Sequence, residues 1–288
     1  MNDSSIRFII NKGGSSSGKS YSIAQILLLF VHISGDNALV MRKVGASIQK
    51  SIYEDFKVAH RQLDMSDYYT FSDSMKRIKH VNGNRIDFAG LDDPEKIKGI
   101  SNYRWVFLDE FSEFDEADFK QIRKRLRGKA GQQIIAAFNP ISEQHWIKRS
   151  IIDTDTWEEV PQGELKIGGL SIRPELCSVK SISINGRNSI LNPRTHDIET
   201  HEPDTVVLQS TYLNNFWVVG SPDGKYGYYD EQCVADFEKD RVHDPDYYNV
   251  YALGEWGVIR TGSEFFGSFN RGKHCSDMAF DESLPIHL

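Results

Sequence analysis

The stretch of sequence that decides the fold reads Gly13-Gly14-Ser15-Ser16-Ser17-Gly18-Lys19-Ser20. The residues before it, Ser5 to Ile10, are rich in β-branched and aromatic side chains and predict a strand. An apolar helical pattern follows from Tyr21 to about Ile33. The stretch matches the phosphate-loop pattern G-x-x-x-x-G-K-S, and the strand-loop-helix context is the one that this pattern requires.

The residue types in this loop suit a phosphate group. Glycines let backbone N–H groups turn inward, and the helix that follows presents its positive end to the same anion. Lys19 is expected to reach the β- and γ-phosphates of a nucleotide, and the Ser20 hydroxyl to bind its magnesium ion. We therefore predict that Gly13 to Ser20 and the adjoining Tyr21 bind nucleotide. The plainer alternative is a flexible Gly/Ser-rich turn.

A second signal, an acidic residue at the end of a buried strand, is needed to hold the magnesium ion. The segment Arg104 to Leu108 contains four consecutive apolar residues, as expected of a strand buried on both faces of a parallel sheet. Asp109 follows at the carboxyl end, where open α/β sheets bind ligands. We predict that Asp109 holds magnesium through its water shell and that Glu110 polarises the attacking water.

A third buried strand, Gln133 to Phe138, ends in Asn139-Pro140. If this strand lies beside the phosphate loop, Asn139 could sense the γ-phosphate; an Asn-Pro turn is an equal alternative. A strand over 38–43, a helix from Gly45 to about Leu63 and a hairpin over 81–89 lie between these segments. The alternation through Ser150 predicts a mainly parallel sheet flanked by helices.

The composition places bounds on the class of protein. The chain has 288 residues, with 34 Lys and Arg against 41 Asp and Glu, giving a net charge of −7 that argues at first against a nucleic-acid partner. Three cysteines, none in a CxxC pair, exclude a disulfide framework and a zinc ribbon. The longest apolar stretch, 26–33, is too short to span a bilayer, so we expect a soluble cytoplasmic protein with no membrane partner.

In these motifs and their order, the sequence resembles the large terminase subunits that package DNA into the heads of tailed phages. The phosphate loop and Asp109-Glu110 are similar to that family's Walker A and Walker B motifs. Further similar segments are Val40 to Lys43 with Ser47 and Ser51 to Tyr53, Phe88 to Gly99, Phe138 to Pro140, Ser210 to Asn215 and Leu253 to Gly257. The resemblance covers roughly residues 5 to 260.

The resemblance implies a P-loop NTPase of the ASCE/RecA-like type, with a small lid subdomain, that uses ATP and Mg²⁺. It implies an ATPase that moves double-stranded DNA into a procapsid as a ring on the portal protein. That ring is expected to be a pentamer, with the small terminase subunit as a further partner and a tendency to be monomeric alone. The protein is then expected to act in the host cytoplasm.

The expected division of the chain is an ATPase core over 1–204, a lid over 205–260 and the start of a linker over 261–288. In the lid we expect a strand after Thr205, then a helix near Asp230 to Lys239, and then the segment from Tyr247 to Leu253. After Gly257 the carboxylates lack the spacing of a two-metal nuclease, so we expect no nuclease activity from this chain.

Many relatives have an arginine in Walker A where this chain has Ser15, so another residue must supply that charge. The candidates are Lys98, Arg104, Arg123, Arg125 and Arg127. Six Lys or Arg residues lie within 120–129, which suits weak, sequence-independent contacts to DNA phosphates. A solvated helix face is the simpler explanation. Alternatives to the packaging motor are another P-loop nucleic-acid motor, such as a helicase or repair ATPase, and a non-enzymatic DNA-binding or capsid-assembly module.

Overall fold

The computed structural model describes residues 6–48, 51–92, 99–160, 166–167, 170–171 and 179–257. Lys98, one of the candidates for the missing positive charge, and the expected linker at 261–288 lie outside these residues. None of the helices that the structure describes is long and apolar enough to cross a membrane.

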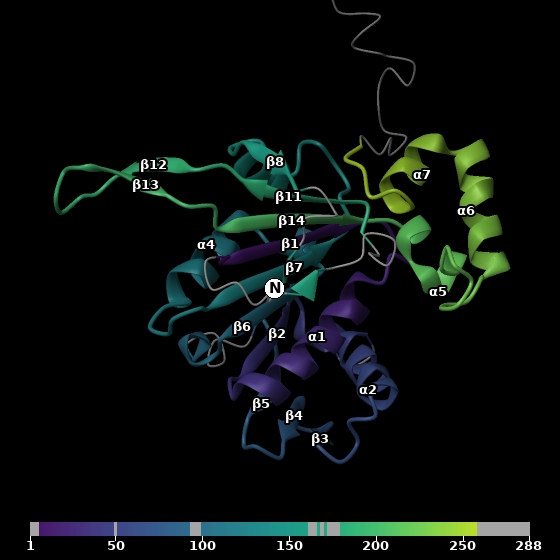
Figure 1. Cartoon of the computed structure of the whole chain (residues 1–288), viewed down its shortest axis with the longest axis horizontal. Coiled ribbons are helices and arrows are strands. Elements are labelled where there is room, and N and C mark those ends of the chain that lie inside the picture. Colours follow the sequence, from purple (N-terminus) through teal and green to yellow (C-terminus); the bar gives the residue numbers. More distant parts are fainter. Residues whose placement is uncertain are drawn as a thin grey trace, which may run out of the picture.

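A ten-stranded sheet forms the centre of the molecule (Figure 1), with the order β3-β4-β5-β2-β6-β7-β1-β14-β11-β8. The six central strands run parallel. They are β5 (Arg85–Gly90), β2 (Ala38–Arg42), β6 (Trp105–Asp109), β7 (Gln133–Phe138), β1 (Phe8–Gly13) and β14 (Thr205–Ser210). The predicted parallel α/β architecture is therefore confirmed.

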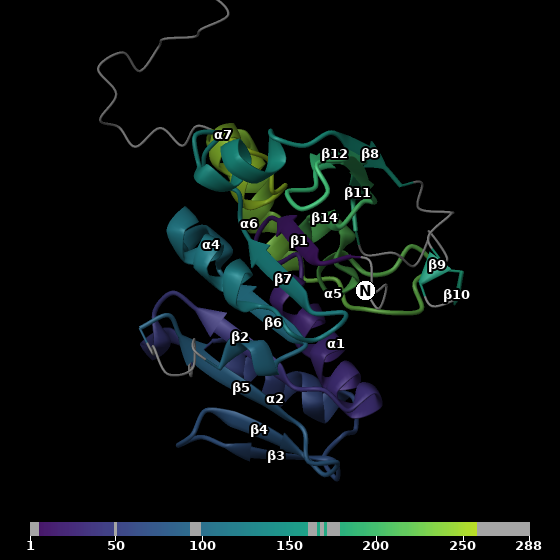
Figure 2. The same cartoon turned by 90° about the vertical axis from the view of Figure 1, so that its left-hand side faces the viewer.

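Helices cover both faces of the central strands (Figure 2). Helices α1 (Lys19–Ser34) and α2 (Ile52–Gln62) lie on one face, and α4 (Glu116–Arg125) lies on the other. Along β6, Trp105 and Phe107 contribute to the core under α1 and α2, whereas Val106 and Leu108 contribute to the core under α4. Because successive side chains of a strand point to opposite faces, two buried faces require the continuous apolar run that the sequence has.

Antiparallel strands extend the sheet at both sides. On one side are β3 (Tyr69–Ser72) and β4 (Arg77–His80), and β4 forms the predicted hairpin with β5. On the other side β11 (Ser181–Asn185) pairs with β14, and β8 (Trp157–Glu159) pairs with β11. The helix expected over 45–63 is shorter: a 3₁₀ turn, η1 (Gly45–Ser47), precedes α2.

The lid contains three short helices, α5 (Phe216–Val219), α6 (Glu231–His243) and α7 (Pro245–Tyr251), preceded by the 3₁₀ turn η7 (Tyr212–Asn214). Buried Tyr212, Val218, Tyr248 and Ala252 form its own small core. The structure differs from the expected division at one point. The strand after Thr205 is β14, which pairs with β1 in the sheet, because its β-branched residues Thr205 to Val207 fit between two strands. The helical lid therefore starts after Ser210.

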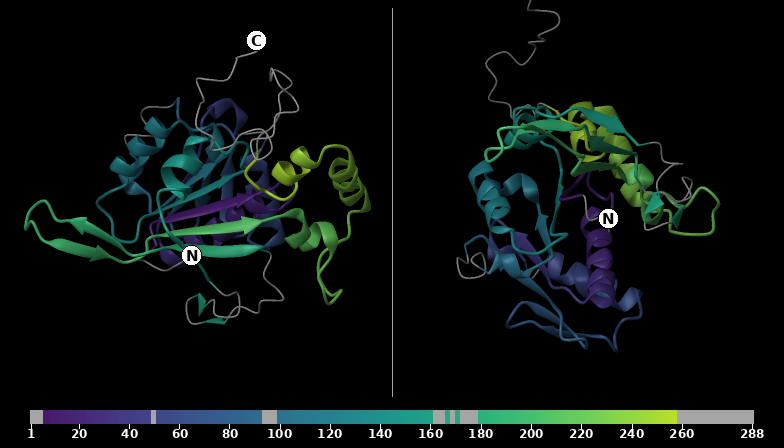
Figure 3. Two further views of the ribbon diagram at one scale, coloured as in Figure 1. Left: turned by 90° about the horizontal axis from the view of Figure 1, so that it is seen from above. Right: turned by 60° about the vertical axis from the view of Figure 1, so that its left-hand side comes forward.

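A hairpin of β12 (Asn188–Leu191) and β13 (Ile198–His201) projects from the body on the side away from the lid (Figure 3). The other described elements are small: β9 (Lys166–Ile167), β10 (Leu170–Ser171), the 3₁₀ turns η2 (Ile100–Asn102) and η3 (Phe111–Glu113), and a single π-helical segment, η4 (Lys148–Ile152).

Candidate nucleotide site

The predicted phosphate loop connects β1 to α1 at the carboxyl edge of the sheet. Gly18 precedes the first helical residue with φ of 77°, a left-handed conformation that favours glycine. Lys19 bends back over the loop, where its Nζ donates to the Gly13 and Gly14 carbonyl oxygens at 2.9 and 2.7 Å. The loop thus holds the Lys19 amine against its own backbone carbonyl groups.

Asn139 lies against the same amine. Its Oδ1 accepts from Lys19 Nζ at 2.9 Å, and its Nδ2 donates to Ser15 Oγ at 3.2 Å. This contact arises because β7, which ends at Phe138, pairs directly with β1. Of the two alternatives for Asn139, the structure favours a place in the site, and γ-phosphate sensing stays a prediction.

Burial lowers the pKa of Lys19 to about 8, against the charges of Glu110 and Asp109, which raise it.

Ser20 and Asp109 meet across the sheet edge. The Ser20 hydroxyl donates to Asp109 Oδ1 at 2.8 Å, although the two residues are 89 positions apart in sequence. A hydroxyl and a carboxylate oxygen are hard donors of the kind that Mg²⁺ prefers beside nucleotide phosphates. The donor set therefore fits the predicted magnesium ion.

Arg42, at the end of β2, holds the other oxygen of Asp109. Its Nε and Nη2 both lie 2.7 Å from Asp109 Oδ2, and Nη2 lies 3.7 Å from Glu110 Oε1. The Asp109 side chain is 2 % exposed, so a buried carboxylate of this kind needs a charged partner. Arg42 leaves Oδ1 for Ser20 while it binds Oδ2, and it is the one arginine among the described residues that forms an ion pair with either carboxylate.

Sequence reasoning did not assign Arg42 to the site. The sequence does place Arg42 at the end of an apolar strand, where its side chain emerges at the carboxyl edge of the sheet. Only the strand order shows that this strand, β2, lies beside β6 and its Asp109.

Glu110 adopts a left-handed conformation with φ of 52°, which is uncommon for a residue other than glycine. Such strain is typical of functional sites. Burial raises the pKa of the Glu110 carboxyl, the neighbouring Asp109 charge raises it further, and Arg42 and Lys19 oppose the rise. A carboxylate with a raised pKa is a better proton acceptor, so Glu110 has the chemistry of a general base.

The lid contacts the loop through backbone and side-chain groups. The Ser15 N–H donates to the Tyr251 carbonyl oxygen at 2.5 Å, and Asn215 Nδ2 donates to the Ser16 carbonyl oxygen at 2.7 Å. Gly254 approaches so closely that an added Cβ would lie 2.5 Å from the Gly13 Cα. These contacts join the lid segments 211–215 and 251–254 to the phosphate loop.

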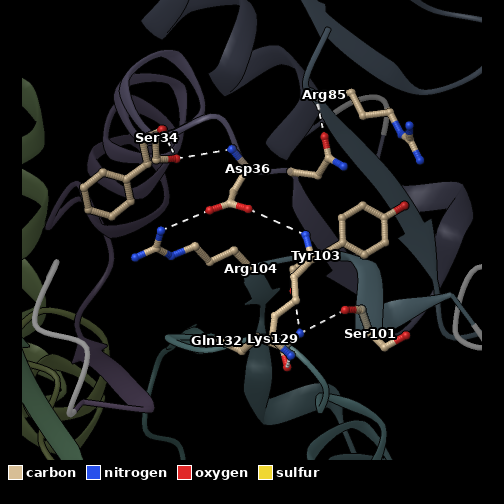
Figure 4. Close-up of polar contacts among 10 residues, drawn as sticks. Ser34, Asp36, Arg85, Ser101, Tyr103, Arg104, Lys129 and Gln132 are labelled. Carbon is tan, nitrogen blue, oxygen red and sulfur yellow. Dashed lines mark hydrogen bonds and ion pairs between the residues drawn. The ribbon is translucent and has the colours of Figure 1, made fainter. Parts of the chain in front are cut away.

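Two sets of predicted residues lie outside this cluster. The Tyr21 hydroxyl donates to Gln62 Oε1 of α2, so this side chain extends toward α2 rather than over the phosphate loop. Arg104 precedes β6, at the opposite end of the strand from Asp109, and its Nη1 pairs with Asp36 at 3.0 Å (Figure 4). Arg123, Arg125 and Arg127 lie at the end of α4 or just beyond it, also away from Asp109.

Comparison with known proteins identifies the family of this chain. Residues 6–255 match the profile of a family described as phage terminase large subunit. The chain belongs to that family. Among curated terminase proteins, the PBSX phage terminase large subunit of Bacillus subtilis (strain 168) is 25 % identical over 247 residues, covering 85 % of this chain and 48 % of the relative. The large terminase subunit of Bacillus phage SPP1 is 32 % identical over 108 residues, covering 36 % of this chain and 26 % of that protein.

Solved terminase structures share the fold. The large terminase of a thermophilic bacteriophage, in complex with ADP, aligns with a TM-score of 0.57 at 15 % identity, covering 88 % of this chain and 49 % of that one. The HK97 bacteriophage large terminase aligns with a TM-score of 0.50 at 11 % identity, covering 87 % and 47 %. The chain thus spans about half the length of the terminases that it matches.

Proposed function

We propose that this chain is the ATP-hydrolysing motor of a terminase and couples ATP hydrolysis to the movement of double-stranded viral DNA into a procapsid. The observation that supports this most directly is the meeting of Lys19, Ser20, Asp109, Glu110 and Asn139 at one edge of the sheet in a member of the terminase family.

In the proposed reaction, the N–H groups of the loop from Gly13 to Ser20 bind the phosphates, and Lys19 turns from its backbone partners toward the β- and γ-phosphates. Glu110 accepts a proton from a water molecule, whose oxygen forms the new bond to the γ-phosphorus as the bond to the β-phosphate oxygen breaks. ADP and inorganic phosphate leave, and Glu110 releases its proton to solvent, which restores the carboxylate. Mg²⁺, when bound by Ser20 and the water shell of Asp109, neutralises charge on the phosphate oxygens.

Arg42 is assigned a positioning role in this site. Its two N–H groups fix Asp109 Oδ2, so Oδ1 faces Ser20 and the position of the metal. Its positive charge also opposes the rise in the pKa of the Glu110 carboxyl that burial and the neighbouring Asp109 charge cause. We place Arg42 behind the carboxylates and assign it no contact with nucleotide.

The wider assembly is part of the same proposal. By its family, the chain is proposed to act in the host cytoplasm as a ring, a pentamer, on the portal protein of the procapsid, with the small terminase subunit as a partner. The positive charge missing at Ser15 is proposed to come from a neighbouring subunit, with Arg104 and Arg125 as the candidates retained among the described residues. The family match favours this motor over a helicase, a repair ATPase or a non-enzymatic module.

A packaging assay tests the proposal. With procapsids, partner subunits, DNA and ATP, we expect the wild-type protein to protect DNA from added nuclease and the Lys19→Ala variant to protect none. Failure of the wild-type protein to support ATP-dependent uptake would count against the motor. Mg²⁺-dependent nucleotide binding, measured by calorimetry on the same protein, separates a motor from a module whose loop is only a structural turn.

A further inference from the structure

One face of α4 and of the turn after it is basic. The apolar residues Phe119, Ile122 and Leu126 are buried, at the spacing that points them to one side of the helix. The exposed basic residues Lys120, Arg123 and Lys124 repeat on α4 at the spacing i, i+3, i+4, and exposed Arg127 follows two residues after the helix ends. Together these four residues form a stripe on the solvent side.

These positive charges are largely free of acidic partners. Lys120 pairs with Glu116 of its own helix at 2.7 Å. Arg123 packs on the Phe119 ring at 5.6 Å, and within the described ranges neither it, Lys124 nor Arg127 has an ion pair with a carboxylate. Arg123 and Lys124 lie in the last turn of α4, where a cation interacts favourably with the helix dipole. This effect does not explain Arg127, which lies beyond the last helical residue.

A groove runs beside this stripe. Arg7, at the start of β1, and Leu126 are shared by two adjoining hollows of about 680 and 280 Å³. Lys120, Arg123 and Lys124 line the larger hollow, and Arg127 and Lys129 line the smaller one. Arg7 Nη2 donates to the Leu126 carbonyl oxygen at 3.5 Å, so it is fixed against the end of α4.

Two acidic residues, Asp155 and Asp204, also line the larger hollow, and they come from elements other than α4. Asn185 Nδ2 donates to their carboxylates at 3.3 and 3.2 Å, which ties both of them to the end of β11. The Thr205 hydroxyl donates to Asp204 as well, at 2.8 Å. The basic and the acidic groups of the groove therefore belong to different walls, and the wall formed by α4 is strongly basic.

The groove lies at the amino edge of the sheet. β1 begins there, at Phe8, and ends at Gly13 beside the nucleotide site, so the two places are separated by about 20 Å of strand. Figure 1 shows α4 and the lid toward opposite ends of β1. Binding at the groove thus leaves the nucleotide edge free.

We propose that the basic stripe, Lys120, Arg123, Lys124 and Arg127 with Arg7, binds the phosphate backbone of double-stranded nucleic acid. Charges arranged in a line fit a row of phosphates, whereas one small anion needs charges that converge on a point. The side chains are long, exposed and offer no fixed base-reading geometry, so the contacts are sequence-independent. This inference rests on the proposed motor function and locates its DNA contact away from the ATP site.

The test compares two triple variants with the same loss of charge. Arg123→Ala/Lys124→Ala/Arg127→Ala removes the stripe, and Lys225→Ala/Lys239→Ala/Arg241→Ala removes three exposed cations from the lid. Binding of a fluorescent duplex of mixed sequence is measured by anisotropy between about 50 and 200 mM salt, where phosphate contacts have large effects. Basal ATP turnover and melting temperature are recorded for both variants.

We expect the stripe variant to bind DNA at least about tenfold more weakly at low salt and to lose about two to three from the slope of log K against log salt. The lid variant should bind within about twofold of wild type, and both should keep basal ATP turnover. Equal DNA affinity and slope in the two variants would overturn the proposal. So would equally tight binding of poly-glutamate that the stripe variant also loses, because that result identifies an acidic protein surface as the partner. ATP turnover is read separately, so failure of the motor assignment and failure of the groove are distinguishable.

Discussion

The two edges of the central sheet use charge in opposite ways. At the carboxyl edge, Lys19, Arg42 and Asp109 are buried or nearly so, and each is bound to named partners within 3 Å. At the amino edge, Arg123 and Lys124 are exposed and have no carboxylate partner in the described part of the chain. Both edges belong to the same strands, so the difference reflects what each edge must do.

A site that breaks a covalent bond needs charges in fixed positions, because their effect on the transition state depends on distance and on the exclusion of water. A surface that moves along a polymer needs contacts that form and break readily, and exposed charges in water provide them. Substitutions at the carboxyl edge should therefore cause large losses of turnover. Substitutions in the basic stripe at the amino edge should change DNA affinity and little else.

The largest effect is expected from Lys19→Ala. This change removes the amine at the centre of the loop, and ATP turnover should fall about 10²- to 10³-fold, as for the loss of one group that stabilises transition-state charge. Steady-state release of phosphate measures it. Lys129→Ala at the amino edge is the control and should turn over ATP at the wild-type rate. Equal losses of turnover in both variants would contradict the assignment of catalysis to the carboxyl edge.

Arg42→Gln should reduce turnover about 10- to 100-fold, the usual effect of losing a group that orients a metal ligand. Half-maximal binding of a slowly hydrolysed ATP analogue should also need more Mg²⁺, because Asp109 loses the partner of Oδ2. Titration of the analogue with Mg²⁺ measures this shift. Arg42→Lys, which keeps the charge but loses the two-point contact, should lie between. A normal Mg²⁺ requirement in Arg42→Gln would refute the positioning role.

The pKa of Lys19, about 8 without nucleotide, predicts a dependence of binding on pH. Below pH 8 the amine is already charged in the free protein. Above pH 8 it must take up a proton to bind phosphate, so nucleotide affinity should fall toward tenfold per pH unit. Calorimetry of ATP-analogue binding from about pH 7 to 9.5, in buffers of different ionisation enthalpy, measures both the affinity and the proton uptake. Constant affinity without proton uptake above pH 8 would show that another group supplies the charge.

The smallest effect is expected at Lys43, which contacts the start of α4, the helix whose other end forms part of the basic stripe. Lys43 follows Arg42 and pairs with Asp115 at 2.7 Å and with Asp118, at the start of α4. These groups are partly exposed, so Lys43→Ala should lower stability by no more than about 1 kcal/mol and leave basal turnover within about twofold. Urea unfolding measures the stability. A loss of turnover as large as that of Arg42→Gln would place Lys43 in the nucleotide site.

Much of this organisation follows from local sequence. Local residue patterns predict the phosphate loop and the two buried strands that end before Asp109 and Asn139. The alternation of strands with helices predicts a parallel sheet, and the carboxyl ends of parallel strands share one edge. In the structure the Ser20 hydroxyl donates to Asp109 Oδ1 at 2.8 Å. Their roles with a bound nucleotide stay predictions.

Features that depend on strand order could not be read locally. Arg42 reaches Asp109 only because β2 lies next to β6, and the strand 205–210 joins the sheet only because β1 has a free side for it. From sequence, a solvated helix face explains the basic run at 120–129. Only the packing of α4 against the sheet shows which side of the helix is buried and which side presents the stripe. These features depend on residues that are distant in sequence and adjacent only in the folded chain, so a local sequence pattern does not predict them.

We propose that the carboxyl edge hydrolyses ATP with Glu110 as the proton acceptor. The most direct measurement is ATP turnover by wild type and Glu110→Gln, with analogue binding measured on the same samples. We predict that turnover falls at least about 100-fold in the variant, as expected when a general base is removed, while nucleotide affinity changes by less than about threefold. Turnover by Glu110→Gln at the wild-type rate would contradict the claim.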